Sequence, residues 1–199
     1  GENSSLDSNK NEVSLNPVKK YVVSGKVTDG TSDIVGASVQ LCSTTGTANA
    51  GASAVISTSA TTESDGTYRF SNVPAGNYTI TASKEGYSAS TGASVNVTVS
   101  NSNVTTGTAL TLSLIKYDVY VNGTQVTGIN KDNVLSDSGT PTVVYTPAEG
   151  GTPQTLTLNG VNITNTSSDT HHSGIEASDN LIIALEGDNN TISGSGHAI

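Results

Sequence analysis

Apolar and polar residues alternate along most of this chain, and turn-forming residues interrupt the alternation at short intervals. A period of two places successive side chains on opposite faces of a β-strand, whereas an amphipathic helix needs a period near 3.6. Seven such segments precede Lys116, namely YVVSGKVTD, GASVQLCS, AVISTSATT, TYRFSNV, NYTITAS, ASVNVTVS and TALTLSLI. Seven short strands at this spacing predict a two-sheet β-sandwich.

The same alternation predicts which side chains face the core of the sandwich. The predicted inward set is Val23, Val27, Val39, Leu41, Tyr68, Phe70, Tyr78, Ile80, Val95, Val97, Val99, Leu110, Leu112 and Leu114. Two turns have clear chemistry. Asp65-Gly66 supplies the positive φ of a tight hairpin, and Pro74 with Gly76 fixes the entry to and exit from a second turn.

These turns carry a resemblance to a known family. The segments SGKVTDGTSDIVGASVQL and TTESDGTYRFSNVPAGNYTITASKEGYSAS resemble the carboxypeptidase regulatory-like domain, with a long insertion between the second and third strands. The resemblance implies a transthyretin-like (prealbumin-like) Greek-key β-sandwich that serves as a non-catalytic spacer, a sugar-binding accessory or a presentation module. A related class of surface repeats forms a Lys to Asn isopeptide bond promoted by a buried acid, for which Lys26 would be the candidate.

The pattern changes after Lys116. Asn122-Gly123 predicts a β-hairpin, followed by strands at 142–145 and 155–158. Beyond these, TLTLNGVNITN matches LIIALEGDNNTISG with Leu158 over Leu185 and Ile163 over Ile192, offsets of 27 and 29 residues, and Gly174-Ile175 recurs loosely as Ala198-Ile199. Short strands repeated at a period in the twenties predict a solenoid whose coils stack on one another.

The solenoid prediction has its own inward set, which is Leu156, Leu158, Val161, Ile163, Ile175, Leu181, Ile183, Leu185, Ile192 and Ile199. The blocks YDVYVNGTQVTGINKDNVL, VVYTPAEGGTPQTLTLNGVNIT and GIEASDNLIIALEGDNNTI are similar to bacterial surface proteins with a carbohydrate-binding right-handed parallel β-helix. That resemblance implies binding of polysaccharide, with calcium in some members. The expected fold class is therefore all-β, a Greek-key sandwich plus a partial parallel β-helix (β-solenoid).

Three segments are expected. Residues 1–20 form a polar leader or tether, 21–116 the sandwich, and 117–199 the hairpin entry and first coils of a β-helix cut short at its end. The leader has almost nothing to bury, and we expect an export signal to have preceded it in a protein located at the cell surface or outside the cell. Cys42, the only cysteine, is expected to be buried and inert.

Charge divides the chain in the same place. Up to Lys116 there are seven basic and eight acidic residues, whereas Lys131 is the only cation after it, set against nine carboxylates. An acidic half repels phosphate backbones, which argues against a nucleic-acid partner. No apolar run is long enough to span a membrane.

Calcium is a candidate ligand because Asp169, Glu176, Asp179, Glu186 and Asp188 lie close together in the sequence, and Ca²⁺ prefers carboxylate oxygens. Solvated turns are the alternative. The aromatic candidates for a sugar site are Tyr117, Tyr120 and Tyr145, with packing in the core or hairpin as the alternative. The histidines, His171, His172 and His197, have no metal-binding spacing, and a solvated loop is the default for them.

Catalysis is not expected. Parallel β-helices include pectate lyases, which use clustered aspartates and a basic residue, yet no Arg follows Lys116. The preferred function is a non-catalytic bacterial surface or secreted protein, with the sandwich as stalk and the β-helix as a polysaccharide-binding face. The alternatives are a cell-adhesion protein that binds a host or neighbouring-cell protein, and an accessory part of a polysaccharide-degrading enzyme.

Overall fold

The structure is a computed structural model and describes residues 18–44, 57–137, 139–165 and 173–194. All its regular elements in these ranges are β-strands. The sandwich contains β1 (Lys20–Thr28), β2 (Ser38–Ser43), β3 (Ser57–Thr61), β4 (Thr67–Pro74), β5 (Gly76–Ser83), β6 (Tyr87–Ala89), β7 (Ser94–Val99), β8 (Val104–Thr105) and β9 (Leu110–Leu114). Each of the seven predicted segments contains a strand, and β6 and β8 are short additions.

Two sheets face each other in this sandwich. One has the strand order β4-β1-β9-β6, with β8 paired to β1, and the other has the order β3-β2-β5-β7. The predicted inward residues, with the exception of Leu114, form one core. Val95 and Val97 are partly buried against this core. Leu114 is partly buried but lies outside the cluster.

Cys42 departs from the prediction because it is only partly buried, with its Sγ 3.7 Å from Ser57 Oγ. It follows the fully buried Leu41 in β2. Since successive side chains of a strand point to opposite faces, Cys42 lies on the outer face of its sheet.

The turns that carried the resemblance are held by specific contacts. Gly66 has φ +72°, and a Cβ there would lie 2.7 Å from the carbonyl oxygen of Val27. The Tyr78 hydroxyl donates a 2.9 Å hydrogen bond to the carbonyl oxygen of Pro74, which ties the strand back to the turn before it. Both contacts fix where β4 and β5 begin, so the turn residues position the strands as well as connect them.

One buried polar side chain links the loop before β2 to the segment that follows β3. The Thr62 hydroxyl donates to the carbonyl oxygen of Ile34 at 2.6 Å and accepts from the backbone N–H of Ala37 at 2.8 Å. The side chain is buried, and both capacities of its hydroxyl are therefore satisfied. Sequence patterning does not single out this residue.

A second core lies in residues 117–194, which we call the second unit. Its strands are β10 (Lys116–Val121), β11 (Thr124–Thr127), β12 (Val143–Thr146), β13 (Thr155–Asn159), β14 (Asn162–Asn165), β15 (Ile175–Ala177), β16 (Ile182–Glu186) and β17 (Thr191–Gly194). They form sheets of order β11-β10-β15, β12-β13-β16 and β14-β17. The predicted hairpin is present, with positive φ at Asn122 and Gly123.

Strands β13 and β14 pair in parallel with β16 and β17. Leu158 lies opposite Leu185, and Ile163 lies opposite Ile192, which are the equivalences that the repeat predicts. The described residues show this stacking once and do not show a closed β-helix. Ala198-Ile199, the loose third match, lies outside them.

Most of the predicted inward residues of the second unit pack in its core, but Leu185 does not. Leu156, Leu158, Val161, Ile163 and Ile175 are buried, and Leu181, Ile183 and Ile192 are partly buried against them. Leu185 is 66% exposed although its partner Leu158 is fully buried. No described strand pairs with the outer edge of β16, so a residue can belong to the predicted inward row and still meet solvent.

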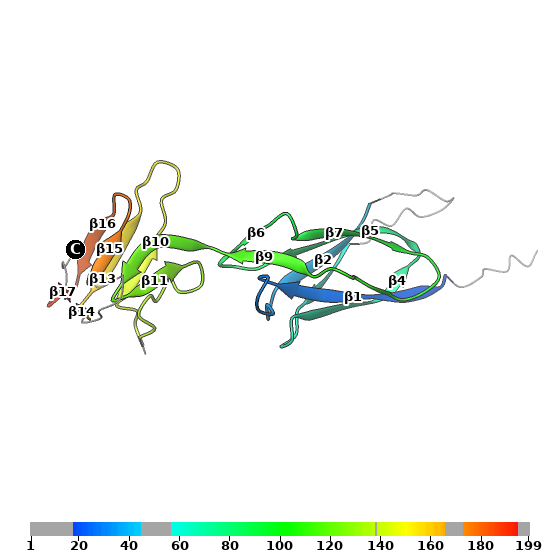
Figure 1. Ribbon diagram of the computed structural model, residues 1–199, viewed down its shortest axis with the longest axis horizontal. Helices are drawn as coiled ribbons and strands as arrows, with labels where there is room; N and C mark the ends of the chain where they lie inside the picture. Colours follow the sequence, from blue (N-terminus) through cyan, green and yellow to red (C-terminus); the bar gives the residue numbers. More distant parts are fainter. Residues whose placement is uncertain (1–17, 45–56, 138, 166–172, 195–199) are drawn as a thin grey trace, which may run out of the picture.

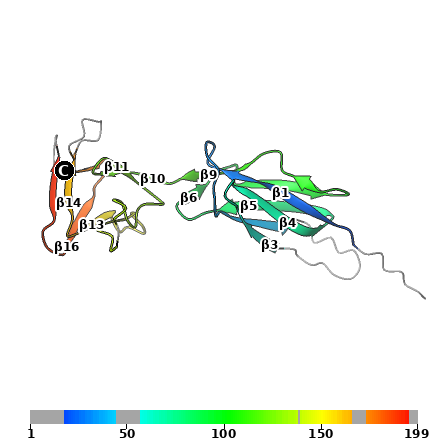
Figure 2. The ribbon, with the colours of Figure 1, turned by 90° about the horizontal axis from the view of Figure 1, so that it is seen from below.

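The sandwich and the second unit lie one after the other along the long axis (Figures 1 and 2). Strand β9 leads almost directly into β10, so one extended segment passes from one core to the other. In the part of the chain that the structure describes, no helix is long and apolar enough to cross a membrane.

Candidate binding face of the second unit

Strand β10 carries the candidate site on the face turned away from its core. Val119 and Val121 are buried, so the alternating residues Asp118 and Tyr120 point outward. In the neighbouring strand, Glu176 lies directly opposite Tyr120 in antiparallel register. A hollow of about 230 Å³ lies here, lined by Asp118, Tyr120, Glu176, Ala177 and Ser178.

This arrangement joins one aromatic ring to two carboxylates and a hydroxyl. The ring is partly exposed, Asp118 is exposed and Glu176 is partly buried. Carboxylates accept hydrogen bonds from hydroxyl groups, and an aromatic face packs against apolar C–H groups. The hollow therefore suits a neutral polyhydroxylated ligand better than an anion.

The other two predicted tyrosines pack with the core. Tyr117 and Tyr145 have ring centroids 4.7 Å apart at an interplanar angle of 52°. Tyr145 is only 2% exposed, and its hydroxyl donates to Oε1 of Gln154 at 2.7 Å. Burial raises the pKa of the Tyr145 phenol, and Tyr117 adds to the shift. Tyr145 is therefore packed in the core, which is the alternative that the sequence left open for it.

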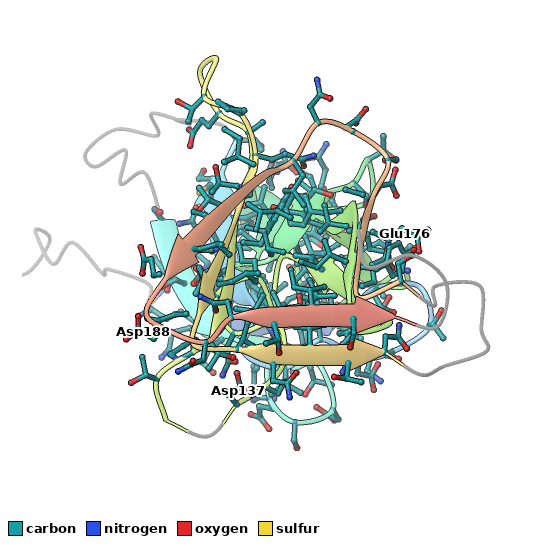
Figure 3. All side chains as sticks on the ribbon, turned by 90° about the vertical axis from the view of Figure 1, so that its left-hand side faces the viewer. Asp137, Glu176 and Asp188 are labelled. Atoms are coloured by element: carbon teal, nitrogen blue, oxygen red, sulfur yellow. The ribbon has the colours of Figure 1, made fainter. Side chains whose placement is uncertain are left out.

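The predicted calcium ligands that the structure describes are not brought together. Within the described residues, no three side chains among His, Cys, Asp and Glu are close enough to hold a metal ion. Figure 3 shows Glu176 and Asp188 on opposite sides of the second unit. Glu176, Asp179, Glu186 and Asp188, the four candidates that the structure describes, do not form such a group. Asp169, His171, His172 and His197 lie outside the described residues.

Acidic residues here do take part in local structure. Figure 3 also shows Asp137 at a third position on the rim, where its carboxylate accepts hydrogen bonds from the Thr142 side chain and, at 3.3 Å, from the Thr142 backbone N–H. Such bonds hold the loop between β11 and β12. Asp137 therefore has a structural role in the second unit that needs no metal ion.

A tight joint of backbone connects the sandwich to the second unit. The N–H of Ile115 donates to the carbonyl oxygen of Gly86 at 3.0 Å, and the N–H of Gly128 donates to the carbonyl oxygen of Ile115 at 2.8 Å. A Cβ on Gly128 would lie 2.6 Å from the Cα of Gly86. Glycine is required at position 128 because its backbone contacts the backbone of Gly86. We call Gly86, Ile115 and Gly128 the joint.

Lys26, the isopeptide candidate, lies on the surface. Its Nζ is 2.8 Å from Oδ2 of Asp33, and the two side chains are 42% and 39% exposed. The acid in this exposed ion pair differs from the buried acid that promotes an isopeptide bond. The structure therefore places Lys26 in an ordinary surface contact.

Sequence reasoning missed part of this geometry. Tyr120 was predicted, but Asp118 was not, and Glu176 was assigned to calcium. The signal for Asp118 is present, because it has the same parity as Tyr120 in the alternating run YDVYV. No local signal exists for Glu176, because it reaches Tyr120 only when the distant strand β15 returns to pair with β10.

Comparison with known proteins supports the sandwich. Residues 22–112 match the family model described as the carboxypeptidase regulatory-like domain, so the resemblance found in the turns is confirmed for that part of the chain. The match covers less than half of the chain. No curated protein sequence matches.

Several solved structures are similar to part of the chain. The major pilin subunit BcpA of Bacillus cereus is 16% identical, with a TM-score of 0.35 over 48% of this chain and 30% of that one. A DUF3823 family protein from Parabacteroides merdae is 16% identical, with a TM-score of 0.36 over 52% and 50%. The minor pilin GBS52 of Streptococcus agalactiae is 17% identical, with a TM-score of 0.34 over 49% and 46%. The chain thus spans half or less of each of these structures, and none of their functions is transferred to it.

Proposed function

We propose that this chain is a non-catalytic bacterial module, secreted or held at the cell surface, in which the sandwich presents a polysaccharide-binding second unit. One observation carries the proposal. Strand β10 begins at the joint and, within a few residues, supplies Asp118 and Tyr120 to the outward hollow. The same strand therefore connects the supporting part to the binding face.

The binding half of the proposal rests on the chemistry of the hollow. A sugar ring stacks its C–H face on Tyr120, and its hydroxyls donate hydrogen bonds to Asp118 and Glu176. The hollow is open and small, so it holds one or two residues of a longer polysaccharide that runs across the outer face of the sheet β11-β10-β15.

The presenting half rests on the joint and on the direction of the chain. Strand β1 starts at the end of the sandwich far from the second unit, and β16 and β17 lie at the opposite end of the molecule (Figure 1). A chain that enters at one end and reaches the other through close backbone contacts at glycines holds its binding face at the far end of the sandwich.

The second unit is proposed to be the first part of a right-handed parallel β-helix. The register of β13 with β16 and of β14 with β17 supports this, since both pairs are parallel and occur at the repeat offsets. Division of the chain into residues 1–20, 21–116 and 117–199 stays a proposal, supported by the two separate cores.

The function is tested by titrating the full chain with neutral and acidic plant and bacterial oligosaccharides. Binding is detected as changes in the amide chemical shifts of the chain. Binding should move the signals of 118–120 and 176–178. Tyr120→Ala should abolish it and Tyr120→Phe should retain most of it, because the phenyl ring keeps the stacking face. The control is Glu186→Gln, which removes an exposed acid outside the hollow.

Two results would count against this proposal. Glycans that bind equally well to Tyr120→Ala would place the site elsewhere, and a chain that binds none of a broad glycan panel would not be a polysaccharide-binding module. In the second case, adhesion through a protein partner becomes the leading function.

A further inference from the structure

A larger hollow lies in the sandwich, outside the face assigned above. It has a volume of about 410 Å³ and opens between the two sheets, with β2 and β5 on one side and β6 and β9 on the other. Its floor includes Ala82 and Leu112, which belong to the buried core. The ring of Tyr87 and the Ala89 side chain complete an apolar lining. A hollow of this size is in the range of small-ligand sites.

One cation is fixed at the edge of this hollow. Lys84 Nζ donates a 2.5 Å hydrogen bond to the carbonyl oxygen of Val35 and lies 5.5 Å from the centroid of the Tyr87 ring. Two contacts that hold the same ammonium reduce the side-chain entropy that a ligand would otherwise have to remove. An ammonium has three N–H donors, and the carbonyl uses one of them.

No carboxylate neutralises Lys84 among the described residues. The ion pairs found there join Lys26 to Asp33 and Lys131 to Asp132. Glu85 follows Lys84 in the chain and also lines the hollow, but it is exposed, and no ion pair joins it to Lys84. Lys84 is therefore a half-buried, oriented cation with no ion pair among the described residues, and its remaining donors can serve the anion of a ligand.

We propose that this hollow binds a carboxylate carried on a small apolar group, with the carboxylate on Lys84 and the apolar group on Leu112, Ala82 and Tyr87. The charge of Lys84 favours the carboxylate of the ligand, and the apolar floor favours the apolar group that carries it. The carboxyl terminus of a peptide that ends in an aliphatic residue has this chemistry, and so has a free short-chain acid. The site lies on the sandwich and is independent of the polysaccharide face.

The same lining disfavours other ligands. A phosphate group is recognised by several cations or by backbone N–H groups at once, and here a single lysine is present. A neutral sugar would leave the apolar floor facing its hydroxyls, which costs free energy when they lose water without a partner.

The test uses the full chain and three probes, namely acetyl-Leu-Leu with a free carboxylate, the same dipeptide as its amide, and isovalerate. Binding is followed by amide chemical shifts. We expect shifts at 36–38, 82–89 and 112, and about tenfold tighter binding of the carboxylate form than of the amide, as for a partly exposed charged hydrogen bond. The preference should weaken as salt is raised.

Variants separate the charge from the fold. Lys84→Gln should remove the tenfold preference and Lys84→Arg should keep part of it, while Lys26→Gln, at a surface lysine of the same sandwich, should leave it unchanged. Binding of isovalerate as well as the dipeptide identifies a free acid as sufficient, and binding of the dipeptide alone identifies a peptide terminus; both support the site. Equal binding of the amide, or no shifts at these residues with any probe, would overturn it.

Discussion

The sandwich and the second unit have the same alternating pattern of apolar and polar residues, but they bury the apolar faces of their strands to different extents. In the sandwich, the inner face of each sheet meets another sheet, so Val23, Leu41 and Ile80 are fully buried. In the second unit, the last strands β16 and β17 have a described neighbour on one side only. Leu158 and Leu185 lie opposite each other, yet one is buried and the other is mostly exposed. Alternation predicts which way a side chain points, and the next layer decides whether it is buried.

The largest expected effect separates these two leucines. Leu158→Ala should lower the free energy of unfolding of the second unit by about 2–5 kcal/mol, because it removes a packed side chain and leaves a cavity. Leu185→Ala should change it by less than about 0.5 kcal/mol, as is usual for exposed positions. Chemical denaturation of both variants measures the difference.

Leu41→Ala is the matched change in the sandwich, with an expected loss of about 2–5 kcal/mol in that unit. Tyrosine fluorescence and amide exchange together assign each transition to one unit. If Leu185→Ala destabilises the chain as much as Leu158→Ala, the exposed row of β16 is covered in solution and the contrast between the two regions fails.

The second prediction concerns the joint. Gly128→Ala places a methyl group against the backbone of Gly86, which should cost about 1–3 kcal/mol if the contact is kept, or loosen the joint if it is not. Residual dipolar couplings should then require two alignment tensors instead of one. Gly107→Ala is the control, since a Cβ there meets nothing within 4 Å. Unchanged couplings and stability in Gly128→Ala would show that the joint is not tight.

The sandwich could be predicted from the sequence because its information is local. Strands of period two and turns such as Asp65-Gly66 each specify a short segment, and the seven segments then leave few ways to bury their apolar faces. Thr62 was missed because its two hydrogen bonds reach residues 25 and 28 positions away. Nothing in the local pattern distinguishes it from the many other threonines around it.

The candidate site was predicted only in part for the same reason. Tyr120 was named as an aromatic, and Tyr117 and Tyr145 were grouped with it, although only their pairing across the core separates the three. The acids were grouped because they are close in sequence, whereas Figure 3 shows two of them, Glu176 and Asp188, on opposite sides of the second unit. Sites assembled from distant strands need the register, and composition does not contain it.

The third prediction tests the long-range hydrogen bonds of Thr62. Thr62→Val keeps the shape of the side chain but leaves the Ile34 carbonyl and the Ala37 N–H without their partner. The expected loss is about 1–3 kcal/mol in the sandwich. Thr61→Val, at the exposed last position of β3, is the control. Equal stability of the two variants would mean that water replaces the Thr62 hydroxyl.

The fourth prediction tests the turn that begins β5. Tyr78→Phe removes the hydroxyl that donates to the Pro74 carbonyl and should cost about 0.5–1.5 kcal/mol, with the ring still packed in the core. Tyr87→Phe serves as the control for loss of a tyrosine hydroxyl. Thermal unfolding should show the difference in the transition of the sandwich alone, and a shift in the second unit as well would show that the units unfold together.

The smallest effect is expected from pH, and it also distinguishes the two regions. Hydrogen bonds from the Thr67 hydroxyl and N–H lower the pKa of Asp65, and those from the N–H groups of Ser32 and Thr31 lower the pKa of Asp29. Because the folded state favours the charged form, its extra stability is present above the unfolded pKa of about 4 and is lost as pH falls through the lower folded value. The melting temperature of the sandwich should therefore decline below about pH 4, and Asp65→Asn should reduce the decline. Asp188→Asn, in the second unit, is the control. A sandwich transition with the same pH dependence in Asp65→Asn as in the parent chain would show that this turn does not contribute.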